Sequence, residues 1–131
     1  MTYIKIILFV YLFPATPERV YNECVYQGVK HPDIVTRQFI LETGHGKSRK
    51  CKENNNLFGL ISRSGKFKTW VDCVTAYKED IQEAYYKGGD YYDFLNCMWT
   101  WNGECKRYAE AINYTNKLKQ IKWISTSNQN K

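Results

Sequence analysis

Short segments with helical periodicity, each bounded by glycine, proline or asparagine, constrain this chain most. Apolar residues recur in them at spacings of three and four, the pattern of helices with one buried face. The predicted helices cover residues 16–29, 31–42, 48–54, 72–87, 90–101 and 106–123. Two runs, Phe58–Arg63 and Lys66–Val71, alternate apolar and polar residues around Ser64-Gly65 and predict a small β-hairpin. The expected fold class is α+β, mostly helical.

Length and composition indicate one globular domain. A chain of 131 residues has the usual length of a single domain. Its 44% hydrophobic residues suffice for a core and exclude a disordered tail, a collagen-like fibre or a multi-span membrane protein. The 11 Tyr, 6 Phe and 4 Trp residues also supply flat faces on which sugars or bases stack. The net charge of +6 fits either an anionic polymer as partner or a solvated basic face.

The N-terminus carries an unbroken apolar run, residues 6–13. This run is too short to span a bilayer, which takes about 20 residues. It fits the core of a secretory signal with Ala15 as the last residue before cleavage, although a buried first strand or helix is the alternative. The predicted organisation is a signal peptide over 1–15, a domain over 16–124 and a polar tail over 125–131. We expect a secreted, periplasmic or cell-envelope protein.

The five cysteines do not form a metal-binding pattern. No C-x-x-C pair occurs and the chain has only two histidines, so we expect neither a metal nor a cofactor. In an exported protein a disulfide between Cys97 and Cys105, which flank the predicted helix break at Asn102-Gly103, is the favoured pair. Cys24 and Cys51 form a second candidate pair. The alternative is that most cysteines are buried apolar residues.

One carboxylate lies on the wrong face of its predicted helix. At 100° per residue, Glu42 projects from the middle of the apolar arc that contains Val35, Gln38 and Phe39, in the last turn before Gly44. Burial and the negative end of the helix dipole would both raise its pKa. A glutamic acid that stays protonated near neutral pH is what general-acid catalysis requires. A structural Glu paired with Lys or Arg, or one that reaches solvent, is the alternative.

Three segments together resemble a known enzyme family. They are QFILETGHGKS (38–48), NNNLFGL (54–60) and YAEAINY (108–114). In this combination the chain resembles, over residues 17–124, the glucosaminidase domains of glycoside hydrolase family 73, which are bacterial peptidoglycan hydrolases. The resemblance implies a lysozyme-like fold, in which a helical lobe and a small β-hairpin lobe flank a groove for the glycan strand.

The resemblance also implies site residues. Glu42 matches the catalytic acid of the family, and Tyr108 matches a tyrosine proposed to assist catalysis. His45 stands where Trp or Tyr is common in the family, which alters one stacking position. Asn55, Phe58 and Gly59 match the loop that forms the floor of the family's cleft. The predicted substrate-binding residues are His45, Asn55, Phe58, Gly59, Trp70 and Tyr114.

A second catalytic acid is harder to place. Glycoside hydrolysis normally uses two carboxylates, and residues 60–70 contain none. Asp72 is the nearest candidate, but its position also suits the N-cap of the following helix. A route with one acid exists when the substrate carries an N-acetyl group, because the 2-acetamido oxygen then attacks the anomeric carbon. Tyr108 would orient that group or stabilise developing charge.

The predicted function is therefore that of a monomeric peptidoglycan hydrolase, an endo-β-N-acetylglucosaminidase that cleaves β-1,4 bonds of the glycan strand. It would need no cofactor, bind no nucleic acid and insert stably into no membrane after signal cleavage. Muramidase or lytic-transglycosylase cleavage and a non-catalytic cell-wall module remain alternatives. A basic nucleic-acid-binding module would explain the charge and the aromatic residues but not the position of Glu42.

Overall fold

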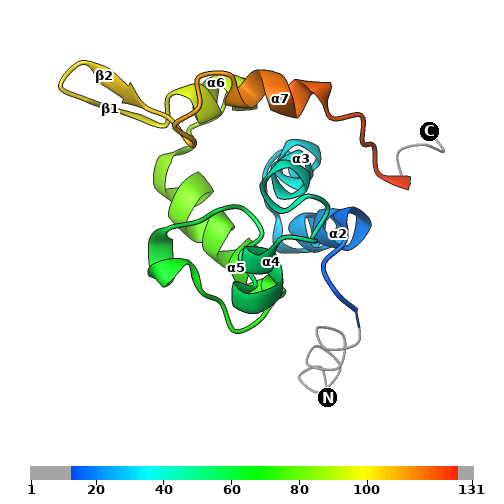
Figure 1. The fold of residues 1–131 in the computed structure, drawn as a ribbon. Coiled ribbons are helices and arrows are strands. Elements are labelled where there is room, and N and C mark those ends of the chain that lie inside the picture. Colours follow the sequence, from blue (N-terminus) through cyan, green and yellow to red (C-terminus); the bar gives the residue numbers. More distant parts are fainter. Residues whose placement is uncertain (1–12, 127–131) are drawn as a thin grey trace.

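The computed structural model describes residues 13–126 of the chain. Two helices, α2 (Pro17–Gln27) and α3 (Pro32–Thr43), pack against each other (Figure 1). Helix α2 begins where the Thr16 side chain accepts a hydrogen bond from the backbone N–H of Arg19. It ends at Gly28, whose φ of +78° is a left-handed conformation that glycine adopts at low cost. The chain can therefore turn directly into α3.

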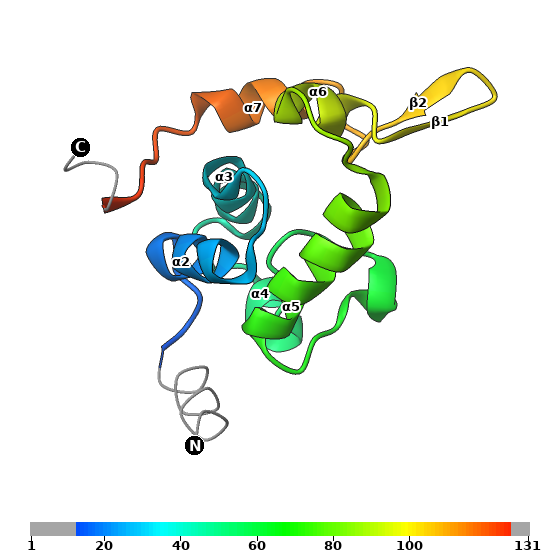
Figure 2. The same cartoon turned by 180° about the vertical axis from the view of Figure 1, so that it is seen from behind.

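The remaining helices surround this pair. They are α4 (Arg49–Asn54), α5 (Trp70–Tyr77), α6 (Tyr91–Asn96) and α7 (Tyr114–Gln120), and α5 continues into the π-helical segment η2 (Lys78–Glu83). Figures 1 and 2 show α6 and α7 side by side along one edge of the molecule, with α7 next to α3. With the two short strands described below, this architecture confirms the predicted α+β, mostly helical class.

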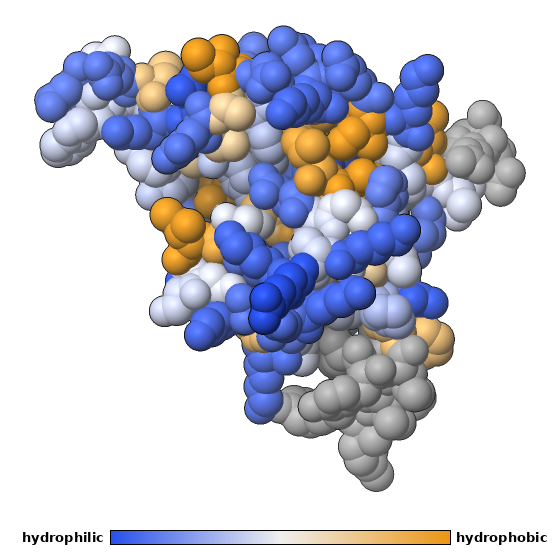
Figure 3. Space-filling view, in the orientation of Figure 1, coloured by the Kyte–Doolittle hydropathy of each residue, from blue (hydrophilic) through white to orange (hydrophobic). Residues whose placement is uncertain are grey.

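The core is formed by buried side chains from these helices and from the segment between α4 and α5. Its largest fully buried members are Tyr77, Tyr91, Phe39, Phe58, Leu57, Leu95 and Leu118. The face of the molecule seen in Figure 3 is mostly hydrophilic, with separate apolar patches. Among residues 13–126, no helix has the length and apolar character needed to cross a membrane.

The predicted hairpin at 58–71 is wrong, because none of these residues forms a strand. The backbone between Gly59 and Gly65 includes left-handed residues at Gly59, Arg63, Ser64 and Gly65, with φ between +53° and +67°. Such residues interrupt the extended conformation that strand pairing needs. The Asn56 side chain replaces a partner strand: its amide donates to the carbonyls of Leu60 and Gly65, and its oxygen accepts from the Leu60 N–H.

The hairpin of this protein lies later in the chain, where a helix was predicted to extend and another to begin. Strands β1 (Trp99–Trp101) and β2 (Glu104–Lys106) pair antiparallel around Asn102-Gly103. Both turn residues have positive φ, +51° and +78°, which is the backbone conformation that favours Asn-Gly in two-residue hairpins. The last helix, predicted over 106–123, is shorter than expected: Lys106 belongs to β2 and the helix α7 covers Tyr114–Gln120.

The predicted disulfide between Cys97 and Cys105 is confirmed, and it closes the base of this hairpin. Cys24 and Cys51 are buried and unbonded, as is Cys73, so the second predicted pair is wrong. Burial raises the pKa of the Cys73 thiol to about 12, so it stays protonated at neutral pH. These three cysteines therefore pack as small apolar residues.

Asp72 and Ser125 have surroundings that differ from those expected from the sequence. Asp72 was predicted as the N-cap of its helix, but Thr69 is the N-cap and Asp72 is the third residue of α5. The Thr69 hydroxyl accepts from the Asp72 N–H and the Asp72 carboxylate accepts from the Thr69 N–H, a capping box. Ser125, predicted to begin a polar tail, is buried and its hydroxyl donates to Glu18. Residues 1–12 of the predicted signal peptide and residues 127–131 lie outside the described residues.

Candidate active site

The carboxyl group of Glu42 lies against the backbone of the loop that follows α4. Glu42 is in the last turn of α3, and a Cβ atom built on Gly59 would lie 2.7 Å from its Oε2. Gly59 also has a φ of +67°. Any larger residue at position 59 would therefore collide with the carboxyl group as well as strain the backbone.

The environment of Glu42 favours its protonated form. The residue is exposed as a whole, but its carboxyl group lies against Gly59 of the loop and next to Tyr114 of α7. Burial raises the pKa of the Glu42 carboxyl, while a hydrogen bond from Tyr114 and the charge of Lys50 partly oppose that rise. The net direction is upward, as the position of Glu42 on the apolar face of its helix predicted.

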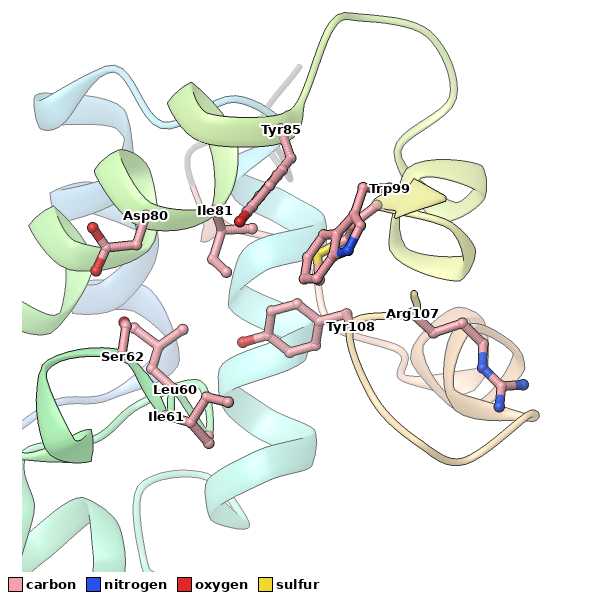
Figure 4. A pocket seen from close by; sticks show the side chains of 11 residues that line it. Leu60, Ile61, Ser62, Asp80, Ile81, Tyr85, Trp99, Arg107 and Tyr108 are labelled. Atoms are coloured by element: carbon pink, nitrogen blue, oxygen red, sulfur yellow. The ribbon is translucent and has the colours of Figure 1, made fainter. Parts of the chain in front are cut away.

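A cavity of about 470 Å³ opens beside this contact. Gly59 lines it on one side, whereas Glu42 itself does not; the acid reaches the cavity wall only through its contact with Gly59. Figure 4 shows Leu60 and Ile61 on the loop side, with Tyr108 facing them and Tyr85 next to Trp99. The rings of Tyr85 and Trp99 are stacked, with centroids 4.5 Å apart and planes inclined by 24°.

Tyr108 connects the cavity to the loop. Its hydroxyl group donates a hydrogen bond to the carbonyl oxygen of Phe58, the residue before Gly59. The hydroxyl end is buried, which raises the Tyr108 pKa well above its ordinary value, while the ring lines the cavity. The Tyr108 ring also stacks on Tyr114, with centroids 5.7 Å apart. Tyr108 therefore fixes the loop segment that touches Glu42; its predicted catalytic role stays a prediction.

An acid that sequence analysis did not identify, Asp80 of η2, also lines the cavity. Its carboxylate accepts hydrogen bonds from Arg63 at 3.0 and 3.1 Å, and Arg63 contacts Glu79 at 2.9 Å as well. Arg63 lowers the Asp80 pKa, so Asp80 is ionised and paired. The ion pair ties the turn after Leu60 to η2 across a sequence separation of 17 residues.

Asp72 does not line the cavity. Its exposed carboxylate is engaged in the capping box at the start of α5. Trp70 is buried, and its indole N–H donates to the carbonyl of Phe13 at 3.3 Å. Trp70 lines a different, smaller cavity that includes Ala15. The structure therefore does not bring these two predicted site residues to Glu42.

The other predicted residues lie closer to the acid or shape its surroundings. Phe58 is fully buried against Tyr77, with ring centroids 4.8 Å apart. The Asn55 side-chain amide donates to the backbone carbonyls of Phe67 and Lys68, which holds the loop in place. His45 is exposed in the left-handed turn after α3, with a φ of +65°.

Tyr85 and Trp99 were missed by sequence analysis. Trp99 was assigned to the face of a helix, because Tyr91, Phe94, Leu95 and Met98 precede it at helical spacing. The Asn-Gly dipeptide three residues later was the available signal for a strand. No group of three or more potential metal ligands occurs within the part of the chain that the structure describes.

A carboxylic acid with a raised pKa near an aromatic-lined cavity, on a mostly helical fold, is the kind of arrangement that glycoside hydrolases use. A family model described as mannosyl-glycoprotein endo-β-N-acetylglucosaminidase matches residues 20–126. The chain therefore belongs to the glucosaminidase family, and the family prediction is confirmed. Comparisons with curated proteins and with solved structures returned no significant match.

The close contact at Gly59 predicts a strong effect of Gly59→Ala. The new methyl group would displace the Glu42 carboxyl in addition to the backbone strain, which costs about 1–2 kcal/mol for a left-handed residue. We expect a lower melting temperature and a large loss of glycan hydrolysis. Gly44→Ala is the matched control, since Gly44 has a φ of +58° and open space around it. Equal activity of the two variants would contradict this interpretation.

Proposed function

We propose that this protein is a peptidoglycan hydrolase, an endo-β-N-acetylglucosaminidase that cleaves β-1,4 bonds with Glu42 as general acid. The observation that carries the proposal is the carboxyl group of Glu42, held with a raised pKa against Gly59, a residue that lines the aromatic cavity. A protonated Glu42 would donate its proton to the glycosidic oxygen as the bond to the anomeric carbon breaks.

The hairpin supports a glycan as the substrate. Trp99 and Trp101 are separated by one residue on β1, so their side chains lie on the same face of the strand. They are 39% and 65% exposed, which leaves their rings available for stacking. The stacked pair of Tyr85 and Trp99 joins this face to the cavity. The net charge of +6 further suits an anionic cell-wall polymer.

We propose the one-acid mechanism because both other candidate acids are engaged. Asp72 accepts from the Thr69 backbone and Asp80 is paired with Arg63. The 2-acetamido oxygen of the substrate would attack the anomeric carbon, and Glu42 would protonate the leaving oxygen. Water would then open the cyclic intermediate and return the proton to Glu42, so that one bond is hydrolysed in total.

Replacing the acid tests the proposal directly. We expect Glu42→Gln to lower the rate of peptidoglycan hydrolysis by a factor on the order of 10² or more, because Gln cannot donate the proton. Glu53→Gln is the control, since Glu53 is an exposed residue of α4 paired with Arg49. Mass spectrometry of the products would identify the sugar at each new reducing end. N-acetylmuramic acid at that position, or an anhydro product, would favour the muramidase or transglycosylase alternative. Wild-type rates in folded Glu42→Gln would disprove the role of Glu42.

The same variant should also change how stability depends on pH. The pKa of Glu42 is higher in the folded than in the unfolded state, so folding favours the protonated form. Stability from this group is fully present below the unfolded pKa and is lost as pH rises through the folded pKa. Glu42→Gln lacks this loss. We therefore expect the melting temperature of Glu42→Gln, relative to that of wild type, to increase as the pH rises above the ordinary pKa of a glutamate. A difference in melting temperature that does not change with pH would contradict the raised pKa.

The one-acid mechanism makes a second, separate prediction. Asp72→Asn should reduce stability by about 0.5–2 kcal/mol through the helix cap and leave turnover largely intact. Glycan strands with N-deacetylated glucosamine should resist cleavage, because they lack the attacking acetamido oxygen. Collapse of turnover in a folded Asp72→Asn variant would instead identify Asp72 as the second acid.

We also propose that the protein is exported, on the basis of the apolar run over residues 6–13. A peptidoglycan substrate lies outside the inner membrane, so the two proposals support each other. N-terminal sequencing of the protein from the extracellular or envelope fraction should begin near Thr16. Exported protein that still begins at Met1 would disprove cleavage of a signal peptide.

A further inference from the structure

A continuous chain of side-chain hydrogen bonds runs through the core and ends at Tyr114, beside the carboxyl group of Glu42. Tyr114 bonds to the Glu42 carboxyl, and the side-chain amide N–H of Gln38 donates to the Tyr114 hydroxyl at 3.2 Å. The Tyr77 hydroxyl donates to the side-chain oxygen of Gln38. The hydroxyl groups of Tyr77 and Tyr91 are 2.6 Å apart. These four residues come from α3, α5, α6 and α7, and each is more than nine-tenths buried.

At the end away from Glu42, this series of hydrogen bonds is joined to the protein backbone through Gln82. The Gln82 side-chain amide donates to the Tyr91 hydroxyl and to the carbonyl of Lys30, both at 2.8 Å. Its oxygen accepts from the Lys30 backbone N–H at 2.7 Å. Lys30 lies in the connection between α2 and α3. The Gln82 side chain is therefore fixed in orientation by a pair of backbone hydrogen bonds.

Donor and acceptor capacity gives this chain a single direction. Each tyrosine hydroxyl has one hydrogen to donate. Tyr77 donates that hydrogen to Gln38, so Tyr91 must donate to Tyr77. Tyr91 in turn accepts from Gln82. At the other end Tyr114 accepts from Gln38, which leaves its hydrogen for Glu42. Every hydrogen in the chain therefore points towards Glu42.

We propose that Gln38, Tyr77 and Tyr91 are positioning residues that hold Tyr114 as a donor to the Glu42 carboxylate. Hydrogen bonds in series polarise one another, most strongly where water is excluded. The donated bond favours the ionised form of Glu42 and so limits how far burial raises its pKa. We call the series Gln82, Tyr91, Tyr77, Gln38 and Tyr114 the relay. The relay thereby sets the pH range in which Glu42 still carries a proton. This inference rests on the proposed function of Glu42.

Other groups that face Glu42 act on it through different routes. Lys50 of α4 lowers the pKa of the carboxyl through its charge. Tyr108 lies close enough for the Glu42 charge to raise its pKa, but its hydroxyl is bonded to Phe58. Neither Lys50 nor Tyr108 is hydrogen-bonded to Gln38 or Tyr77 in the relay. A change made at Tyr77 should therefore reach Glu42 through Gln38 and Tyr114.

The test is a ¹³C-NMR titration of the full chain labelled at the glutamate carboxyl carbons, with Glu42 assigned by the signal missing from Glu42→Gln. Removing a hydroxyl from the relay weakens stabilisation of the carboxylate, so the Glu42 midpoint should rise. We expect a rise on the order of 1 pH unit in Tyr114→Phe and roughly half of that in Tyr77→Phe. The alkaline limb of hydrolysis should move to higher pH in the same order, because the acid stays protonated longer.

Tyr86→Phe is the matched control for Tyr77→Phe. The Tyr86 ring packs edge-on against Tyr91 at 5.0 Å, but its hydroxyl bonds to Gly89 and His31, outside the relay. Its Glu42 midpoint should equal that of wild type. An unchanged midpoint in folded Tyr77→Phe, or equal shifts in Tyr77→Phe and Tyr86→Phe, would overturn the relay.

A measurement on the wild-type protein decides the matter if Tyr77→Phe does not fold. The ¹³Cζ signal of Tyr77 should titrate with the midpoint of Glu42, and this response should disappear in Glu42→Gln. A Tyr77 ¹³Cζ shift that does not change as Glu42 titrates would overturn the relay. Failure of the proposed function has a different signature, because Glu42→Gln would then hydrolyse peptidoglycan at the wild-type rate while the NMR coupling persisted.

Discussion

The contact between the Glu42 carboxyl and the Gly59 backbone is the constraint on which the site depends. It brings the end of α3 against a loop that begins more than ten residues later, and it leaves no room for a side chain at position 59. The same loop segment is held from the other side by Tyr108, whose hydroxyl bonds to Phe58. The loop therefore covers one side of the carboxyl group, and its Gly59 also lines the cavity.

The segment between α4 and α5, which forms one wall of the cavity, is held in place by side chains and not by a β-sheet. Side-chain amides of Asn55 and Asn56 satisfy the backbone carbonyls of Leu60, Gly65, Phe67 and Lys68. Ion pairs of Arg63 with Asp80 and Glu79 then tie the left-handed turn to η2. Exposed ion pairs contribute little to stability on their own. Their contribution here is geometric, because they fix one edge of the cavity relative to the other.

Local rules predicted part of this site from the sequence. Helical periodicity placed Glu42 on the same arc of α3 as Val35, Gln38 and Phe39, because residues 35–42 follow one repeat and need no knowledge of the tertiary fold. The hairpin was misplaced because alternation at 58–71 is weak, whereas the left-handed turn residues and the hydrogen bonds of Asn56 dominate there. Asp80 could not be found, since its position in the cavity depends on how α5 and η2 pack.

The hydrogen-bonded tyrosines were equally inaccessible to pattern analysis. Gln38 lies on the apolar arc that also contains Glu42, but its partner Tyr114 is 76 residues away and Tyr77 is 39 residues away. Pairing across such separations follows from the packing of α3, α5 and α7, which sequence periodicity does not specify. Sequence analysis predicted Tyr114 as a substrate-binding residue and not as a buried link to Gln38.

The orientation of the proposed relay has a consequence for how the acid would work. Tyr114 has one hydrogen and directs it at Glu42, since its oxygen already accepts from Gln38. A carboxyl oxygen that accepts this bond is a poor place for a second hydrogen. A proton taken up by Glu42 is therefore confined to the other oxygen, in a fixed position on the side chain. A general acid gains from such confinement, because its proton need not search for the leaving oxygen when a glycan binds.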